Sequence, residues 1–235
     1  MRRAVNPLNP LSSRPTAIPG MNTTLRITEI FHSLQGEART VGLATTFVRL
    51  TGCPLRCQYC DTAYAFSGGE SMELAEIVRR VNLYTATHVT VTGGEPLAQT
   101  ASLELLSLLC DEGYQVSLET SGAIDTGKVD ERVSVVLDLK TPGSNEVGKN
   151  LYENIGHLKP GDQVKFVICD RQDYDWAKFK LSEYDLLGRV SDVLFSASYD
   201  QLNAADLAGW ILEDGLQVRL QVQLHKILWG NKPGV

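Results

Sequence analysis

The sequence "FVRLTGCPLRCQYCDT", residues 47–62, joins a β-strand pattern directly to a loop that carries Cys53, Cys57 and Cys60. The chain has only two further cysteines, Cys110 and Cys169. An odd number of clustered thiols does not resemble the disulfide framework of a small secreted domain. The loop therefore indicates a metal or redox site, and we expect a reducing, cytoplasmic compartment.

Composition narrows the class of protein. The chain has 235 residues, of which 43% are hydrophobic and 21% charged, and this is enough for a sizeable core. A net charge of -6 and a pI near 5.3 argue against direct binding to nucleic acid, which needs clustered Lys and Arg. No apolar run approaches the roughly 20 residues of a membrane span. We expect an enzyme-sized domain that contacts neither nucleic acid nor membrane.

The first 22 residues differ from the rest of the chain. They contain two early arginines and several prolines, and they lack the apolar core of a secretory signal. We predict that residues 1–22 form a disordered extension and that Met21 is a plausible second start. Residues 23–235 are then expected to form a single domain.

From Leu25 onward, β-branched runs bounded by Gly and Pro alternate with amphipathic stretches, which is typical of βα units and a parallel sheet. The predicted strands are residues 45–52, 87–94, 115–122, 133–140, 162–168, 192–198 and 216–225. We expect Ser71 to cap a helix over residues 74–81, and Asn203 to cap another that Gly215 ends. A complete barrel takes about 250 residues, so the pattern predicts an α/β fold with about six units, a partial, open (β/α) barrel.

Three kinds of site fit the cysteine loop. A closed zinc site needs four protein ligands, but Cys110 falls in a predicted helix and Cys169 at a strand end, so neither completes a set. A thioredoxin-like pair uses Cys57 and Cys60 and leaves Cys53 unexplained. The spacing favours an iron–sulfur cluster, in which three thiolates leave one iron free for a small molecule.

Two motifs then carry a family resemblance. Cys-x3-Cys-x2-Cys, as "CPLRCQYC", and "TGGEP" at residues 92–96 resemble the cluster and Gly-Gly-Glu-Pro motifs of radical S-adenosylmethionine (SAM) enzymes. With "FHSLQGE", residues 31–37, "LETSG", residues 118–122, and "QLHK", residues 223–226, nearly all of residues 25–235 resemble the 7-carboxy-7-deazaguanine synthase family.

The resemblance implies a carbon–nitrogen lyase of the queuosine and 7-deazapurine pathway with a truncated radical SAM barrel. Its members convert 6-carboxy-5,6,7,8-tetrahydropterin to 7-carboxy-7-deazaguanine by radical ring contraction with loss of ammonia. The implied cofactors are a 4Fe-4S cluster, SAM and Mg²⁺, and SAM is regenerated after each turnover. The implied partners are a flavodoxin-like or ferredoxin-like electron donor and a second copy of the chain.

The resemblance also assigns residues. The cluster ligands would be Cys53, Cys57 and Cys60, and Thr62 would hold Mg²⁺. The substrate would meet Leu34, Gln35, Gly36, Arg49 and Thr92. The catalytic residues would be Glu37, Arg49, Glu119 and His225. SAM would contact Tyr59, Cys60, Asp61, Gly94, Glu95, Asp138, Leu139, Lys140, Ser196, Ala197, Ser198 and Tyr199. Two positions depart from the family's pattern: Ala197 stands where a proline is expected, and "DLK" at residues 138–140 replaces Ser-Pro-Lys.

Most of these polar residues also have a purely structural explanation. Arg49 interrupts an apolar strand, where a charge is costly unless it is paired, so it either contacts a ligand or forms an ion pair. Thr62 could be a helix N-cap. The remaining structural explanations are turn carboxylates for Glu37 and Glu119, a core or terminal histidine for His225, and solvated strand ends for Lys140 and Lys165.

Two other functions compete. A glycyl-radical activase shares the cysteine spacing but acts on a protein, whereas "LQGE" and Arg49 favour a small acidic substrate. A zinc or redox module without enzymatic activity is the second. Iron content and colour under anaerobic conditions separate it from a cluster enzyme.

Overall fold

The computed structural model describes residues 23–232 and 234, and these form one nine-stranded sheet in the order β3-β1-β2-β4-β5-β6-β7-β8-β9. The predicted extension, residues 1–22, lies outside the described residues, as does Met21. The strands are β1 (Thr24–Leu34), β2 (Ala44–Leu50), β3 (Glu70–Glu73), β4 (His88–Gly93), β5 (Gln115–Thr120), β6 (Ser134–Asp138), β7 (Gln163–Ile168), β8 (Asp192–Ala197) and β9 (Arg219–Gln221). The α-helices are α1 (Leu74–Val81), α2 (Ser102–Asp111), α3 (Arg171–Glu183), α4 (Leu186–Arg189), α5 (Ala204–Glu213) and α6 (Leu224–Trp229). The 3-10 helices are η1 (Ala63–Phe66), η2 (Pro96–Ala98), η3 (Pro142–Ser144), η4 (Val147–Lys149) and η5 (Tyr152–His157).

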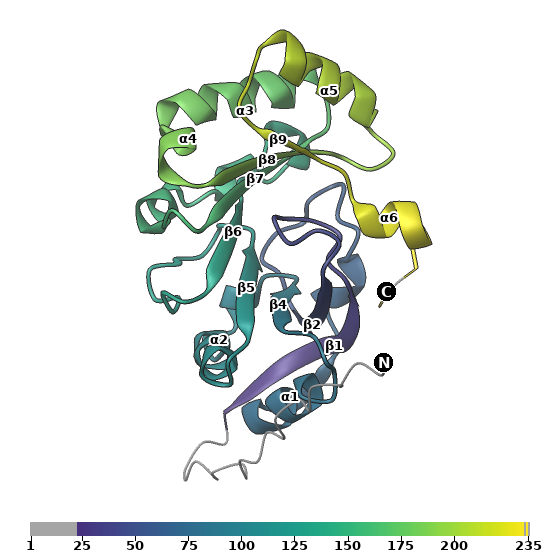
Figure 1. Cartoon of the computed structure of the whole chain (residues 1–235), viewed down its shortest axis with the longest axis vertical. Coiled ribbons are helices and arrows are strands. Elements are labelled where there is room, and N and C mark those ends of the chain that lie inside the picture. The colour runs from purple at the N-terminus through teal and green to yellow at the C-terminus, as the bar shows by residue number, and fades with distance from the viewer. Residues whose placement is uncertain (1–22, 233, 235) are drawn as a thin grey trace, which may run out of the picture.

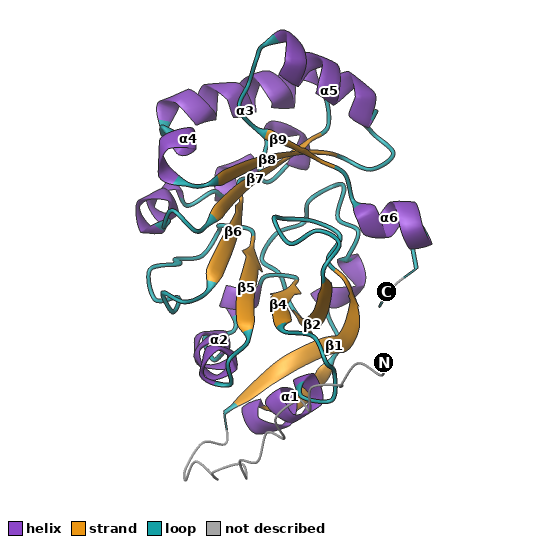
Figure 2. Cartoon of the chain, in the orientation of Figure 1, coloured by secondary structure: helices purple, strands orange, loops and turns teal. Residues whose placement is uncertain are grey.

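The sheet bends into an open arc, with α1 to α5 on its outer side (Figure 1). From β2 to β9 the six neighbouring pairs are all parallel, which confirms the prediction of about six units in an open, partial barrel. Two strands that we did not predict extend the parallel sheet at one edge, where β1 runs antiparallel to both β2 and β3 (Figure 2). A short connection between β1 and β2 permits this antiparallel pairing, whereas parallel neighbours need a long crossover.

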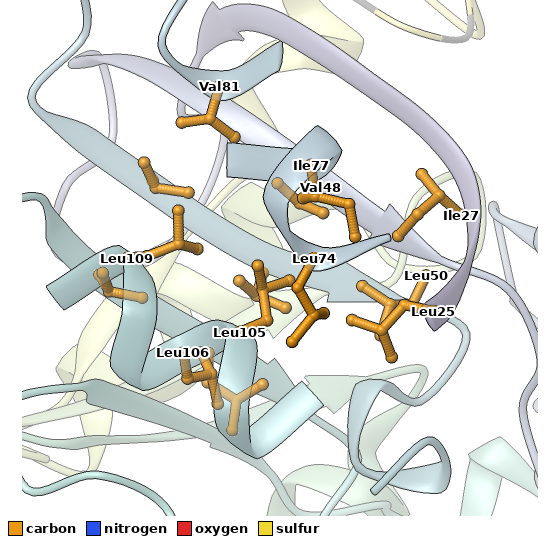
Figure 3. Close-up of a cluster of buried hydrophobic side chains, with 14 of the residues drawn as sticks. Leu25, Ile27, Val48, Leu50, Leu74, Ile77, Val81, Leu105, Leu106 and Leu109 are labelled. Atoms are coloured by element: carbon orange, nitrogen blue, oxygen red, sulfur yellow. The ribbon is translucent and has the colours of Figure 1, made fainter. Parts of the chain in front are cut away.

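Two apolar clusters hold the helices against the outer face of the sheet. The first packs α1 and α2 onto the strands from β1 to β5, and Figure 3 shows Leu74, Ile77 and Val81 of α1 in it. Their spacing of three and four residues places them on one helical face, as the sequence predicted. The second cluster packs α3 and α5 onto β6, β7 and β8, with Tyr174 and Phe195 fully buried. The helices therefore leave the inner face of the arc to other side chains.

Of the three helix-end residues predicted from sequence, two are confirmed by the structure and one is wrong. Asn203 caps α5 by accepting a hydrogen bond from the Ala205 amide, and Gly215 follows the helix with a φ of +60°. The predicted Ser71 cap is wrong, because Ser71 lies in β3 opposite Arg26 and Glu73 is the N-cap of α1. Pairing with β1 satisfies this backbone, so the helix starts two residues later than a Ser71 cap would place it.

The strand predicted over residues 216–225 is also too long. Only residues 219–221 join the sheet, and α6 begins at Leu224 after the N-cap Gln223. The Leu224 amide donates to the Gly36 carbonyl, so a contact with the β1–β2 loop ends the extended backbone. Within the described residues no helix is long and apolar enough to span a membrane.

Candidate active site

A cavity of about 560 Å³ lies at the carboxyl ends of the parallel strands. Strand-end loops converge there because all strands from β2 to β9 point the same way. The predicted residues that line it are Leu34, Gln35, Gly36, Glu37, Arg49, Cys53, Cys57, Tyr59, Cys60, Asp61, Thr62, Thr92, Gly94, Glu119, Asp138, Lys140, Ser196, Ala197, Ser198, Tyr199 and His225. The structure thus brings together residues that are up to 191 positions apart, from Leu34 to His225.

Two predicted residues do not line the cavity. The Glu95 side chain is fully buried, and its carboxylate accepts hydrogen bonds from the Leu97 and Ser121 amides and from the Thr120 and Ser121 hydroxyls. Leu139 follows β6 and is buried in the second apolar cluster. Successive side chains of an extended chain point to opposite faces, so Leu139 faces outward while Asp138 and Lys140 face the cavity.

The cysteine loop follows β2, and its three thiols face the cavity. Burial is the main cause that raises the pKa of Cys53, and it raises the pKa of Cys57 to about 11. No three His, Cys, Asp or Glu side chains of residues 23–232 and 234 converge as ligands of one ion. A cubane cluster does not require such convergence, because each thiolate binds a different iron. The other two thiols, Cys110 on α2 and Cys169 just after β7, do not line the cavity.

The glycine pair after β4 packs against the cysteine loop. A Cβ on Gly94 would lie 2.2 Å from the Gly52 carbonyl oxygen and 2.8 Å from Cys53 Cβ. The Glu95 amide donates to the same Gly52 carbonyl at 2.8 Å. A glycine lacks a Cβ, which permits a ligand to approach its backbone closely. The backbone contacts of this glycine pair show a further requirement, the close approach of the two motifs to each other.

Buried charges form one wall of the cavity. Lys165 Nζ lies 3.0 Å from Glu37 Oε2 and 3.4 Å from Asp138 Oδ2, and Lys140 Nζ lies 2.9 Å from the same Asp138 oxygen. Burial alone would lower the pKa of both lysines, but the neighbouring carboxylates raise it. Both lysines are only 8% exposed, so the explanation as solvated strand ends is wrong. We assigned Lys165 no role from sequence, although a lysine inside the buried strand "QVKFVI" was a signal.

The pKa values of two carboxyl groups in this wall are shifted in opposite directions. Burial alone would raise the pKa of Glu37, but the Lys165 charge and a hydrogen bond from Gln223 lower it. Burial raises the pKa of Glu119, to which Gln35 Nε2 donates a hydrogen bond at 3.4 Å. The pKa of Glu37 is therefore shifted below, and that of Glu119 above, the usual value of a glutamate. Gln223 is a second lining residue to which we assigned no role, although it belongs to the "QLHK" motif.

Arg49 fits both of its explanations. Its side chain lines the cavity and is 14% exposed. Its Nε donates to Glu29 Oε1 at 2.7 Å. The guanidinium also lies over the rings of Phe31 and Tyr64, with Cζ 5.7 Å and 6.0 Å from their centroids. An ion pair with Glu29 and exposure to the cavity thus coexist.

Asp61 of the cysteine loop is the main polar link to α6. Its Oδ2 lies 3.7 Å from Lys226 Nζ and 3.9 Å from His225 Nε2. Burial alone would raise the pKa of Asp61, but these two neighbours hold it at about 2. Thr62 precedes η1 without making a side-chain capping bond, so the N-cap explanation finds no hydrogen bond to support it.

Comparison with known proteins identifies the family to which this chain is similar. A model of the radical SAM superfamily matches residues 47–144. The 7-carboxy-7-deazaguanine synthase of Koribacter versatilis (strain Ellin345) is 42% identical over 219 residues, which cover 87% of this chain and 97% of that protein. The enzyme of the same name from Chlorobaculum tepidum is 42% identical over 208 residues, covering 87% and 94%.

The chain belongs to the 7-carboxy-7-deazaguanine synthase family. It is a radical SAM enzyme and a lyase, which confirms the resemblance over the activase and zinc or redox alternatives. The crystal structure of QueE from Escherichia coli has the same fold, with a TM-score of 0.67 at 22% identity over 85% of this chain and 94% of that one. The family's cofactors are a 4Fe-4S cluster and SAM.

The residues present fit these cofactors. Three thiols of one loop face the cavity, as a cluster with one open iron requires. Beside them, Tyr59 Oη and Asp138 Oδ1 are buried atoms with no hydrogen-bond partner among the described residues. Buried polar atoms normally have a partner. Both residues line the cavity, so a bound molecule with polar groups can supply the missing partners.

The cysteine geometry leads to a first prediction. Cys53→Ala, Cys57→Ala and Cys60→Ala should each lose most of the iron after anaerobic reconstitution, because a cluster with two thiolates is weakly held. Iron analysis and visible absorption measure the loss. Cys169→Ala is a close control, since Cys169 Sγ lies 3.7 Å from Gln58 Nε2 of the same loop, and Cys110→Ala is a distant one. Equal iron loss in the two control variants would contradict the assignment.

Proposed function

We propose that this cavity converts 6-carboxy-5,6,7,8-tetrahydropterin to 7-carboxy-7-deazaguanine with loss of ammonia. The observation that carries the proposal is the placement of the Arg49 guanidinium, Glu37 and Glu119 on the walls of the cavity that the three thiols face. A cation suits the substrate carboxylate, and acceptor groups suit the N–H edge of a pterin. The volume of about 560 Å³ lies within the usual range for small-molecule sites.

The substrate's flat ring and its carboxylate need different partners. Phe31 and Phe47 are stacked, with ring centroids 4.8 Å apart, and give the cavity an apolar wall beside Arg49. We assign the substrate carboxylate to Arg49 and the polar edge of the ring to Glu37, Glu119 and Gln35. Leu34, Gly36 and Thr92 complete the contacts as lining residues. We also propose that residues 23–235 form a single radical SAM domain.

We assign SAM to the opposite wall. When bound, the cluster and SAM supply a 5′-deoxyadenosyl radical that abstracts hydrogen from the substrate. The chain's own contribution is placement: Asp138 Oδ1 and Tyr59 Oη offer unused hydrogen-bonding capacity, and the loop after β8 adds further backbone and side-chain groups. The proposed SAM contacts are Tyr59, Cys60, Asp61, Gly94, Asp138, Lys140, Ser196, Ala197, Ser198 and Tyr199. Glu95 and Leu139 are left for indirect roles, because neither side chain reaches the cavity.

Loss of ammonia requires a proton to be moved to a leaving nitrogen. Burial raises the pKa of Glu119 and the Lys165 charge lowers that of Glu37, so we assign Glu119 as the proton donor and Glu37 as the acceptor. Carboxyl groups whose environments push their pKa values apart are the usual acid and base candidates. His225 lines the same cavity and can orient the substrate through its ring nitrogens.

The proposal also includes a metal ion, an electron donor and a cellular compartment. We assign Mg²⁺ to the Thr62 hydroxyl, which makes no capping bond and faces the cavity. One protein oxygen with substrate and water oxygens suits magnesium, which keeps several waters. A flavodoxin-like or ferredoxin-like protein would deliver the electron. The five free thiols suit a reducing cytoplasm.

Product analysis tests the proposed reaction. Substrate and product differ by one molecule of ammonia, so the conversion is redox-neutral and a hydrogen taken by the radical must be returned. Reconstituted enzyme with SAM, Mg²⁺ and a reductant should form 7-carboxy-7-deazaguanine, with far less than one 5′-deoxyadenosine per product. Chelation of Mg²⁺ should slow the reaction. One equivalent of 5′-deoxyadenosine per turnover would show that SAM is consumed, and would exclude this reaction class.

Arg49 gives a second test of the site. Removing one member of a desolvated charge pair typically costs about 3–5 kcal/mol, or roughly two to four decades in transition-state binding. Arg49→Lys and Arg49→Gln should therefore lose most turnover, because neither has the two-pronged donor of a guanidinium. Both should retain iron and SAM binding. Arg80→Gln, which breaks an ion pair with Glu76 outside the cavity, is the control. Near-normal turnover in the Arg49 variants would assign the carboxylate to another residue.

We also propose that two copies of the chain associate through an apolar face next to the cavity. The face, called the α6 face here, consists of exposed side chains on the β1–β2 loop, β9, the β9–α6 connection and α6: Val41, Leu43, Leu220, Val222, Ile227 and Leu228. These segments adjoin, since Gly36 accepts from Leu224 and Gln221 accepts from Ala38. Contiguous exposed apolar side chains commonly mark protein interfaces, and α6 has no fully buried residue of its own.

Sedimentation tests this association. The wild-type chain should sediment as a dimer, and Ile227→Glu should shift it toward monomer, because a charge would be desolvated in the interface. Leu83→Glu, at another leucine that is 70% exposed, should leave the dimer intact. A monomeric wild-type chain, or an unchanged dimer in Ile227→Glu, would rule out the α6 face.

A further inference from the structure

We infer that Glu29 is a positioning residue that determines which edge of the Arg49 guanidinium faces the cavity. The inference rests on the proposed function, in which Arg49 binds the substrate carboxylate. Glu29 itself does not line the cavity, so any effect on the substrate is exerted through Arg49. No motif in the sequence points to Glu29.

The β1–β2 ladder creates the contact. Glu29 and Arg49 are directly opposite partners in the antiparallel register. Glu29 Oε1 accepts from Arg49 Nε at 2.7 Å and from the Tyr64 hydroxyl at 2.8 Å. The side chains of Glu29 and Arg49 are 22% and 14% exposed, respectively, so this ion pair is largely shielded from water. Tyr64 belongs to η1, directly after the cysteine loop, so Glu29 connects three elements of the site.

The pairing leaves one edge of the guanidinium for a ligand. A guanidinium can bind a carboxylate along its Nε–Nη edge or along the edge formed by its two Nη groups. Glu29 occupies Nε, and within residues 23–232 and 234 neither Nη of Arg49 has a hydrogen-bond acceptor. Phe31 and Tyr64 flank the group and restrict its rotation. The two Nη groups are thereby held as the edge that is available to the substrate.

The negative charge of Glu29 disfavours binding of the substrate carboxylate, whereas its hydrogen bonds favour binding by positioning Arg49. Substitutions can separate these two effects. Glu29→Ala removes both, and leaves Arg49 free to rotate. Glu29→Gln keeps an acceptor, and one amide oxygen at the Oε1 position can take both hydrogen bonds because both converge on that atom. It also removes a negative charge near the incoming carboxylate, which favours binding. If positioning is what matters, the glutamine variant binds substrate at least as well as the wild type.

The experiment measures binding to anaerobically reconstituted enzyme with SAM, by calorimetry. The ligands are 6-carboxypterin, an oxidised analogue that cannot undergo ring contraction, and pterin, which lacks the carboxylate. Glu29→Ala should weaken 6-carboxypterin at least about tenfold, the loss of one good hydrogen-bonded contact, and should leave pterin unchanged. Glu29→Gln should restore 6-carboxypterin binding. In an Arg49→Gln background, Glu29→Ala should cause no further loss, because residues that act through one contact are not additive.

Glu70, a carboxylate outside the cavity, provides the control for Glu29→Ala. Glu70→Ala removes an exposed carboxylate of β3, 3.9 Å from Arg80 and outside the cavity, and should change neither affinity. Wild-type affinity in Glu29→Ala, or equal weakening of both ligands without rescue by glutamine, would overturn the inference. Product formation by the wild type is measured in parallel. A wild type that forms no product refutes the proposed function, whereas an active wild type with an unaffected Glu29→Ala refutes the positioning role alone.

Discussion

The ammonium group of Lys165 holds the two halves of the arc together across its inner face. The outer face has two separate apolar clusters, one over β1 to β5 and one over β6 to β8. Inside, Lys165 on β7 reaches Glu37 of the β1–β2 loop and Asp138 at the end of β6. Removing one partner of a buried ion pair typically costs about 3–5 kcal/mol, because the other charge is left uncompensated. The polar contact between the two halves and the electrostatics of the cavity therefore depend on the same side chain.

This arrangement explains why the inside of the arc contains a binding cavity and is not filled with apolar side chains. A closed eight-stranded barrel packs its centre with layers of apolar side chains. Here β3 and β9 are edges of an open sheet, and the inner wall carries Lys140, Lys165 and their carboxylates. These charges are already paired with one another, so no ligand is needed to neutralise them. Yet Asp138 Oδ1 and Tyr59 Oη still lack hydrogen-bond partners within the described part of the chain, and both residues line the cavity.

The parallel strands and the motif loops could be predicted because their signals are local. A β-branched run that ends in Gly or in the cysteine loop marks a strand and its carboxyl end, and parallel order then places those ends together. The failures all involve distant partners. Ser71 joins a strand because β1 lies beside it, and residues 224–229 become helical where Leu224 bonds to Gly36. Glu95 turns inward because Thr120 and Ser121 of the next strand supply its donors.

Arg49 shows why a charged residue in an apolar strand does not by itself identify a ligand contact. From sequence, only a ligand or an ion pair made the charge tolerable, and the antiparallel partner could not be identified because nothing in the local pattern reveals which residue of β1 stands opposite. The structure supplies that partner, Glu29, at the Nε atom alone. A planar group with five N–H donors satisfies a structural acceptor on one edge and still offers another. The ion pair therefore stabilises the buried charge without a ligand, and its geometry leaves the two Nη groups free for the carboxylate that we propose they bind.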